Sequence, residues 1–215
     1  MKRVICILFT FVLLGGCSKS YEFTLTEKPT KGYENGYEWV DLGLSVKWAS
    51  CNIGAAYSSD YGEYIAWGDI YEKSSYYDDN CKTSGVSYSN LPYLMDAARE
   101  RWGGKWRMPT CENVRELVDK CSWRWTSRWG VSGYECTGPN GNKIFFPAGG
   151  VAYGLDVHDK CTSGYFWTAT PAQEDGEWKD KRSYMFYYNR NDDVEPASNW
   201  YTARRNGLNI RPVMN

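Results

Sequence analysis

Apolar and polar side chains alternate between residues 38 and 50, in the stretch EWVDLGLSVKWAS. One face of that stretch collects Val40, Leu42, Leu44, Val46 and Trp48. A period of two is typical of a half-buried strand, and Gly43 allows the chain to bend there. We therefore predict a strand pair or one bent strand. A second strand is predicted at 62–69 (GEYIAWGD), followed by a long polar loop at 71–90.

The middle of the chain changes to a helical period. Residues 96–102 (DAARERW) form a short candidate helix, and Gly103 and Gly104 after it supply the positive φ of a helix end. A second helix is predicted from Thr110, whose hydroxyl can cap the first turn. Its buried face is marked by residues that recur at helical spacing, namely Val114, Leu117, Val118 and Cys121.

Short strands separated by turns return after Trp123. They are predicted at 133–138, 143–150, 164–170, 182–189 and 207–213. Asn140 and Gly141 supply the turn between the first two, and Phe145 lies between Ile144 and Phe146 in a strand that we expect to be buried on both faces. Two helices among many short strands indicate an α+β fold. We predict two helices packed on short, twisted, mostly antiparallel strands with long loops.

The N-terminus has the pattern of a secretion signal. Lys2 and Arg3 precede an apolar run of eleven residues, 4–14, which is too short to span a bilayer. The sequence LGGC that ends at Cys17 resembles the lipobox of bacterial lipoproteins, in which the cysteine thiol is diacylated; a plain secretory signal is the alternative. We predict a lipoprotein signal peptide at 1–16, a lipid anchor at Cys17 with a polar tether over 17–36, and one domain at 37–215.

Charge excludes one class of partner. Loss of Lys2 and Arg3 with the signal removes two positive charges and takes the formal net charge from −1 to −3. Nucleic-acid binding needs a basic footprint, so nucleic acid is not an expected partner. The lipid anchor is the expected membrane contact. It implies a location in the cell envelope, on the outer membrane and either periplasmic or surface-exposed.

Eight cysteines are present, of which Cys6 leaves with the signal and Cys17 carries lipid. The other six are Cys51, Cys81, Cys111, Cys121, Cys136 and Cys161. In an oxidising compartment six cysteines suggest disulfides, for which fifteen connectivities exist, although buried free thiols are an alternative. Cys111 and Cys121 are expected on one helix, about 15 Å apart, and so cannot pair with each other. No CxxC spacing occurs and the chain has a single histidine, which does not favour a zinc site.

Taken together in order, the motifs resemble a known family. They are WASCNIGA (48–55), GEYIAWGD (62–69), WGGKWRMPTCENVRELV (102–118), CSWRW (121–125), GYECTGPNGNKIFFPAGG (133–150), GYFWTAT (164–170) and RRNGLNIRPV (204–213). This set is similar to the Fibrobacter succinogenes major paralogous domain, a family of secreted bacterial proteins, over residues 37–213. The resemblance implies a C-type lectin-like fold. Formylglycine-generating enzymes and variable receptors share that fold, and the receptors display their variable residues near the C-terminus, on the last strands.

The family comparison also bears on metal and catalysis. Many C-type lectins bind calcium through Glu-Pro-Asn, whereas this chain has Glu195-Pro196-Ala197 and only a solvated acidic loop with Asp192, Asp193 and Asn199 beside it. Formylglycine-generating enzymes use a cysteine pair near the C-terminus, but the last cysteine here is Cys161. His158, the single imidazole, lies in a polar loop without a nucleophile motif. We therefore predict no cofactor, no metal and no catalytic activity.

An aromatic and polar surface is predicted near the C-terminus. The chain contains 11 Trp and 18 Tyr against 7 Phe, and such rings have an apolar body with a polar tip. The candidate ligand-binding residues combine these rings with Arg and Asn, types that are common on recognition surfaces. They are Trp178, Tyr184, Tyr188, Asn189, Asn191, Asn199, Trp200, Tyr201, Arg204, Arg205 and Asn206.

The expected function is a non-catalytic binding module for a glycan or a protein. A glycan site predicts exposed Trp and Tyr rings beside polar side chains in a groove. A protein site predicts a flatter patch of more than about 600 Å² on each partner. A structural or adhesive surface component, such as a fimbrial tip, is the alternative and predicts an exposed, unpaired strand edge. An enzyme related to the formylglycine-generating enzymes is a third possibility.

Overall fold

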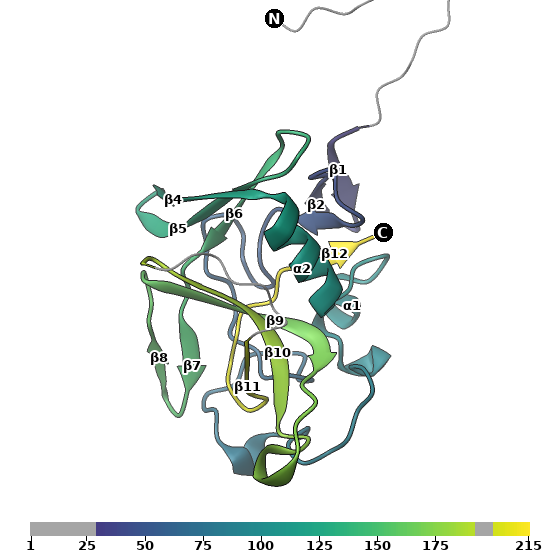
Figure 1. Ribbon diagram of the computed structural model, residues 1–215, viewed down its shortest axis with the longest axis vertical. Helices are drawn as coiled ribbons and strands as arrows, with labels where there is room; N and C mark the ends of the chain where they lie inside the picture. The colour runs from purple at the N-terminus through teal and green to yellow at the C-terminus, as the bar shows by residue number, and fades with distance from the viewer. Residues whose placement is uncertain (1–28, 192–199) are drawn as a thin grey trace, which may run out of the picture.

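A computed structural model describes residues 29–191 and 200–215 of the chain (Figure 1). Its first sheet joins the two ends of the domain and has the strand order β1-β2-β3-β12. These strands are β1 (Lys31–Glu34), β2 (Tyr37–Val40), β3 (Lys47–Ala49) and β12 (Val213–Met214). Strand β12 pairs antiparallel with β3, so the last residues lie beside the first strands of the domain.

Three further sheets make up the rest of the described fold. One contains β4 (Ser122–Arg128), β5 (Val131–Thr137) and β6 (Lys143–Pro147). Another contains β9 (Ser163–Pro171), β10 (Arg182–Asn189) and β11 (Tyr201–Ala203), and the smallest pairs β7 (Val151–Tyr153) with β8 (Asp156–His158). Every pairing between these strands is antiparallel. The predicted α+β class with mostly antiparallel short strands is confirmed.

Both predicted helices form where their capping residues stand. Helix α1 (Ala97–Trp102) begins after Asp96, whose carboxylate accepts from two backbone N–H groups, and ends at Gly103 with a φ of 63°. Helix α2 (Cys111–Lys120) begins after Thr110. In a reciprocal capping box, Thr110 Oγ1 accepts from the backbone N–H of Asn113, and Asn113 Oδ1 accepts from the backbone N–H of Thr110. Short 3₁₀ turns occur at Asp78–Asn80, Tyr93–Met95 and Gly176–Trp178. In the described part of the chain, no helix has the length and apolar character needed to cross a membrane.

The predicted boundary between tether and domain is too late. Strand β1 forms a complete antiparallel hairpin with β2, in which Lys31 lies opposite Val40 and Glu34 opposite Tyr37. The backbone carbonyl of Glu34 also accepts a hydrogen bond from the indole of the buried Trp106. Residues 31–36 therefore belong to the fold. The predicted signal peptide, Cys17 and the first part of the tether lie outside the described residues.

Two predicted strands are replaced by irregular buried chain. Within 62–69 the only strand-like pairing is a single bridge from Ile65 to Leu208, and the segment 207–213 pairs through single bridges before β12. Gly62 and Gly68 both have positive φ, which interrupts an extended run. The alternation at Leu208–Arg211 does not give one exposed face, because all four residues are at most 1% exposed.

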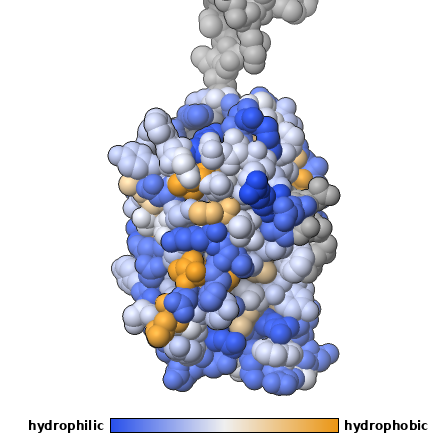
Figure 2. Space-filling model, turned by 90° about the vertical axis from the view of Figure 1, so that its left-hand side faces the viewer, coloured by the Kyte–Doolittle hydropathy of each residue, from blue (hydrophilic) through white to orange (hydrophobic). Residues whose placement is uncertain are grey.

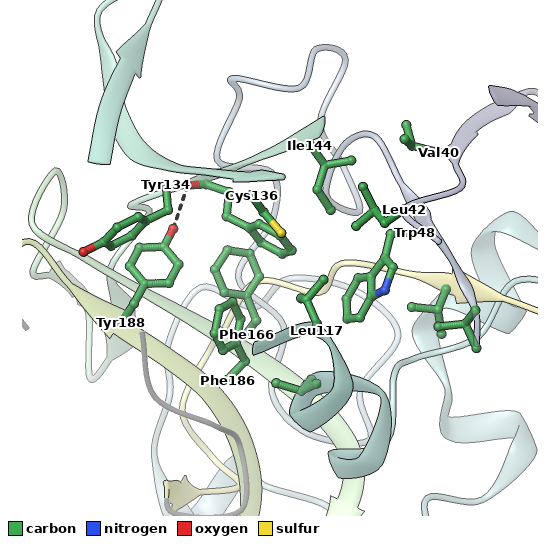
Figure 3. Close-up of a cluster of buried hydrophobic side chains, with 14 of the residues drawn as sticks. Val40, Leu42, Trp48, Leu117, Tyr134, Cys136, Ile144, Phe166, Phe186 and Tyr188 are labelled. Carbon is green, nitrogen blue, oxygen red and sulfur yellow. Dashed lines mark hydrogen bonds between the residues drawn. The ribbon is translucent and has the colours of Figure 1, made fainter. Parts of the chain in front are cut away.

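The sheet β9–β10–β11 separates two hydrophobic clusters. The first core packs α2 and the β4–β5–β6 sheet against one face, and it includes Phe166 and Phe186 (Figure 3). The second core packs α1 and the irregular segments against the other face, and it includes Trp167 and Met185. Because successive residues of a strand point to opposite faces, neighbouring residues of β9 and β10 enter different cores.

A buried guanidinium ties the C-terminal segment to both cores. Arg211 is 1% exposed, stacks over Phe146 at 4.6 Å, and donates to Asn52 Oδ1 at 2.7 Å. Its remaining hydrogen bonds go to the backbone carbonyls of Ala49, Ser50 and Phe145. Burial lowers the pKa of Arg211 to about 10, so the cation is retained at neutral pH. The amide and carbonyl oxygens around Arg211 accept its hydrogen bonds, so the buried cation is satisfied without a carboxylate partner.

Candidate ligand-binding surface

Two of the predicted ligand-binding residues are buried. Tyr188 is 0% exposed and its hydroxyl donates to the carbonyl of Phe146 at 2.7 Å (Figure 3). Arg204 is also 0% exposed. Neither side chain can contact a ligand from solvent. The prediction is wrong for both, because tertiary contacts bury a phenol and a guanidinium that lie among polar neighbours in the sequence.

Arg204 is a buried residue whose hydrogen bonds hold two segments of the chain together beneath the surface. Its Nε donates to the carbonyl of Arg182 and to Ser183 Oγ, and its Nη1 donates to the carbonyls of Thr83 and Val86. The guanidinium lies 4.5 Å from the centre of the Trp67 ring. Burial lowers its pKa below the ordinary value. These bonds hold the start of β10 against the loop that contains residues 83–88.

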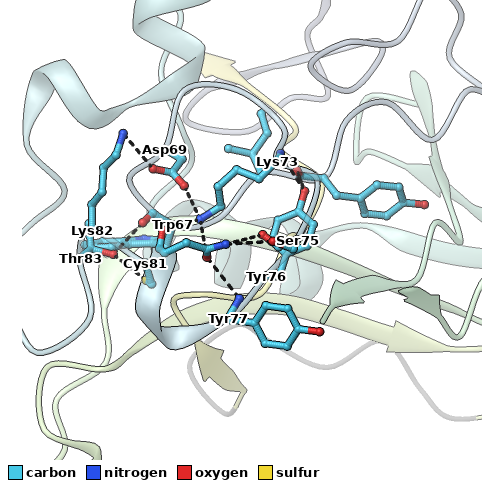
Figure 4. Close-up of polar contacts among 12 residues, drawn as sticks. Trp67, Asp69, Lys73, Ser75, Tyr76, Tyr77, Cys81, Lys82 and Thr83 are labelled. Atoms are coloured by element: carbon cyan, nitrogen blue, oxygen red, sulfur yellow. Dashed lines mark hydrogen bonds and ion pairs between the residues drawn. The ribbon is translucent and has the colours of Figure 1, made fainter. Parts of the chain in front are cut away.

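That loop has its own polar framework (Figure 4). The carboxylate of Asp69 lies 2.8 Å from Lys73 Nζ and 3.8 Å from Lys82 Nζ. Thr83 Oγ1 donates to the carbonyl of Trp67 at 2.8 Å, and Cys81 Sγ lies 3.7 Å from the same hydroxyl. The bond from Thr83 to the carbonyl of Trp67 and the ion pair between Asp69 and Lys73 therefore hold this segment where it meets Arg204.

Exposed and half-buried aromatic residues lie on both faces of the β9–β10–β11 sheet. On the face of the first core, Arg182 stacks on Trp178 at 3.9 Å and lies 5.4 Å from the ring of Tyr201. Tyr201 is paired with Tyr184 across β10 and β11, and their rings meet edge to face at 6.0 Å. We name these four residues, Trp178, Arg182, Tyr184 and Tyr201, the Arg182 surface. Trp178 and Tyr201 are 38% and 40% exposed.

On the opposite face, three rings form a row across the sheet. Tyr165 of β9 lies 4.9 Å from Tyr187 of β10, which lies 4.8 Å from Trp200. We name Tyr165, Tyr187 and Trp200 the Tyr187 row. The hydroxyl of Tyr165 donates to Asp159 Oδ2 at 2.8 Å, and Asn189 Nδ2 donates to the hydroxyl of Tyr187 at 3.1 Å. The two tyrosines of the row also pack against the second core.

The other predicted residues make local contacts. Arg205 pairs with Asp78 at 2.7 Å in an exposed position, and Asn206 Nδ2 donates to Thr202 Oγ1. Asn189 Oδ1 accepts from the backbone N–H of Asn191. Asn199 lies outside the described residues, as do the acidic positions at 192–195 that were considered for calcium.

A polar pocket adjoins the Arg182 surface. It has a volume of about 450 Å³ and is lined by Ser87, Tyr88, Ala172, Gln173, Glu174, Asp175, Lys179 and Asp180. Glu174 connects the two features, because it lines the pocket and its Oε1 lies 3.2 Å from Arg182 Nη1. Three carboxylates against one ammonium make the lining acidic. The wall presents hydroxyl, amide and carboxylate groups, all of which can hydrogen-bond a polar ligand.

The other candidate residues do not form a second site within the described part of the chain. The imidazole of His158 is stacked on Tyr153, with ring centres 3.9 Å apart. Within the described ranges, no group of three or more His, Cys, Asp or Glu side chains is arranged to hold a metal ion. The face that carries the β7–β8 hairpin is mostly polar, with small separate apolar patches (Figure 2). Patches of that size are ordinary on soluble protein surfaces.

Sequence reasoning missed the residues that organise this surface. Arg182 precedes Tyr184 by two positions in a predicted strand, so the period of two places both on one face. The same period of two places Tyr187 on the opposite face of the strand from Tyr184, and this assignment follows from the sequence. Glu174 and the rest of the pocket lie in a loop without a periodic pattern, and nothing local indicates that this loop closes on residues 87 and 88.

Comparison with known proteins identifies no relative: neither protein-family models, nor curated proteins, nor solved structures include a match to this chain.

Proposed function

We propose that this chain is a lipid-anchored binding module of the bacterial cell envelope that captures a glycan at the Arg182 surface and the adjoining pocket. The proposed family is the Fibrobacter succinogenes major paralogous domain, with a C-type lectin-like fold. Support for the fold comes from the antiparallel pairing of β12 with β3, two helices and long loops around short strands. Cys17 is the proposed lipidation site. We propose no cofactor and no catalytic role.

The observation that carries the glycan proposal is the position of Arg182. Its guanidinium is held between the carboxylate of Glu174 and the ring of Trp178, at 3.2 and 3.9 Å. A polar pocket and an exposed ring surface therefore meet at one residue. A sugar ring has C–H faces that pack on aromatic rings and hydroxyl edges that need hydrogen-bonding groups, so it is complementary to both parts.

A protein ligand is less well matched to these features. Stable protein interfaces bury about 800 Å² on each partner and have an apolar centre. The pocket lining is instead dominated by carboxylate, amide, hydroxyl and ammonium groups. For the structural or adhesive alternative, β4 is an edge strand of its sheet and carries Arg124 and Arg128. Charges on an edge strand oppose pairing with another chain.

The direct test is an array of glycans and envelope proteins probed with the full chain in detergent. We expect retention on a subset of glycans, and we expect Trp178→Ala to lower the affinity for them at least tenfold. Trp129→Ala is the matched control, because Trp129 is 95% exposed on the turn between β4 and β5, away from the Arg182 surface. It removes an equally large exposed ring from another sheet.

Three results would count against the proposal. Retention on proteins alone would favour the alternative of a protein ligand or an adhesive component. Equal binding by Trp178→Ala and the unmodified chain would show that the ligand binds elsewhere. Equal losses in Trp178→Ala and Trp129→Ala would indicate a nonspecific aromatic contribution. Circular dichroism of each variant establishes that it is folded before binding is compared.

A further inference from the structure

Three positive side chains converge on one carboxylate on the side of the β4–β5–β6 sheet that faces away from the first core. Glu135 of β5 accepts at Oε1 from Arg124 Nη2 at 2.9 Å and from Lys143 Nζ at 2.8 Å. Its Oε2 accepts from Arg128 Nη2 at 2.9 Å. Each of the three strands therefore contributes at least one charged side chain to a single cluster.

The carboxylate does not balance the cations that surround it. Within the described residues, each of the three cations has Glu135 as its ion-pair partner and no other carboxylate. Hydrogen bonds from Lys143 and the two arginines lower the pKa of Glu135 to about 2, so it carries one negative charge at neutral pH. Three positive charges against one negative charge leave an excess of two. Because like charges held close together repel, an added anion would stabilise this arrangement.

Two of these cations also line a cavity of about 140 Å³. The polar part of its lining consists of Lys31, Glu38, Ser50, Ser58, Arg128 and Lys143. Lys31 and Glu38 add one charge of each sign, so the positive excess of two remains. The guanidinium of Arg128 lies 5.2 Å from the ring centre of the buried Phe145, which is also part of the wall. Since a water molecule of the bulk liquid takes up about 30 Å³, the cavity has room for a group of about five non-hydrogen atoms.

From this cavity and its charges, we propose a binding site for a phosphate group, supplied either by a lipid headgroup or by free phosphate. Within the described residues, Arg128 uses Nη2 alone to bond Glu135, and its Nε and Nη1 groups make no other hydrogen bond. The planar guanidinium matches the spacing of phosphate oxygens, and the two lysines add point charges. The hydroxyls of Ser50 and Ser58 can donate to further oxygens. A phosphate group presents oxygens in several directions, so it can meet donors from different walls of the cavity.

The position of Lys31 makes a lipid headgroup an accessible source. Lys31 is the first residue of β1, and it lies fourteen positions after Cys17, the proposed lipidation site. Fourteen residues span at most about 50 Å when fully extended. A headgroup of the membrane that holds the anchor is therefore within reach of the cavity. The lipid source rests on the anchor in the proposed function, whereas the binding of free phosphate does not depend on it.

Isothermal titration of the full chain in neutral detergent tests the site. Inorganic phosphate is one probe, and glycerophosphoglycerol, the headgroup of phosphatidylglycerol, is the other. We expect saturable binding of at least one probe, and the tighter of the two identifies the source. Lys31→Gln and Lys143→Gln should each raise the dissociation constant by about threefold to fivefold, because each removes one positive charge from the cavity. Lys31 forms no ion pair within the described residues, so its substitution leaves the bonds of Glu135 in place.

Lys105→Gln is the matched control, because Lys105 is exposed and lies outside the cavity lining. Its dissociation constant should stay within twofold of that of the unmodified chain. The absence of saturable binding of both probes would overturn the proposal. Unchanged binding by Lys31→Gln and Lys143→Gln, or equal losses in all three variants, would overturn it as well. Trp178→Ala must bind the probes as the unmodified chain does, so failure of the glycan proposal would leave this result unaffected.

Discussion

The two faces of the β9–β10–β11 sheet carry aromatic groups of similar composition and different structure. On the Arg182 surface, Trp178 and Tyr201 stand beside a cation that continues into a polar pocket. In the Tyr187 row, the rings contact one another at tilted angles, and the tyrosine hydroxyls bond to neighbouring side chains. Rings whose faces and hydroxyl groups already contact other protein groups have less free surface and fewer free hydrogen-bonding groups for a ligand. We infer that the row supports the sheet and that the Arg182 surface binds.

The largest expected effect concerns the buried guanidinium of Arg204. Arg204→Ala removes the guanidinium donor from the carbonyls of Thr83, Val86 and Arg182 and opens a cavity beside Trp67. The carbonyls of Thr83 and Arg182 each keep one backbone donor. We expect a loss of about 3 kcal/mol in the free energy of unfolding, measured in urea.

The neighbouring Arg205→Ala is the matched control for that variant. Among the residues that the structure describes, its charged partner is Asp78, whose side chain is 66% exposed, and exposed ion pairs contribute about 0–0.5 kcal/mol. Equal destabilisation by both substitutions would contradict the distinction between Arg204, whose buried hydrogen bonds stabilise the fold, and the surface residue Arg205. It would also weaken the claim that Arg204 positions the start of β10.

A smaller loss of stability is expected from Tyr187→Ala. Tyr187 is the central ring of the row and also packs against the second core, so truncation removes contacts on two sides. We expect about 2 kcal/mol of destabilisation and unchanged glycan affinity at a temperature where the variant is folded. Weaker binding with unchanged stability would reverse the roles that we assign to the two faces.

The smallest effect is a dependence on alkaline pH. Burial, with a further contribution from the hydrogen bond to Asp159, raises the pKa of Tyr165 well above its ordinary value near 10. The folded chain therefore keeps this proton while the unfolded chain loses it. Stability from this group is complete below pH 10 and falls as the pH rises above 10, by at most about 1 kcal/mol per pH unit after solvent screening.

Tyr165→Phe removes the titrating group while it keeps the ring in the row. Urea unfolding at pH 9 and pH 11 should show a shallower decline for this variant than for the unmodified chain. Parallel declines would mean that other groups account for the alkaline sensitivity, and the assigned state of the row would be wrong.

Local signals predicted the helices and the two longest strands, β9 and β10, well. The bounds of β10 agree with the prediction at 182–189, and Thr110 and Gly103 stand at helix ends because capping depends on adjacent residues. The segments 62–69 and 207–213 were predicted as strands because buried, apolar chain has the same composition whether it pairs along its length or through single bridges. Composition alone does not decide between these two arrangements.

The candidate site was predicted only in part, for a physical reason. Trp178, Tyr184 and Tyr201 were identified from their residue types, and they lie together in the structure. Arg204 was misplaced because its acceptors lie at Thr83 and Val86, more than a hundred residues away along the chain. A charged residue in a polar turn has no local mark of burial, since burial depends on which distant carbonyls surround it.

The most direct test of the central claim compares two tryptophans of nearly equal exposure. Trp178 is 38% exposed on the Arg182 surface, and Trp200 is 41% exposed at the end of the Tyr187 row. Isothermal titration with one glycan retained on the array gives the dissociation constant for each alanine variant. The account predicts at least a tenfold increase for Trp178→Ala and a change within twofold for Trp200→Ala. A larger increase for Trp200→Ala would contradict it.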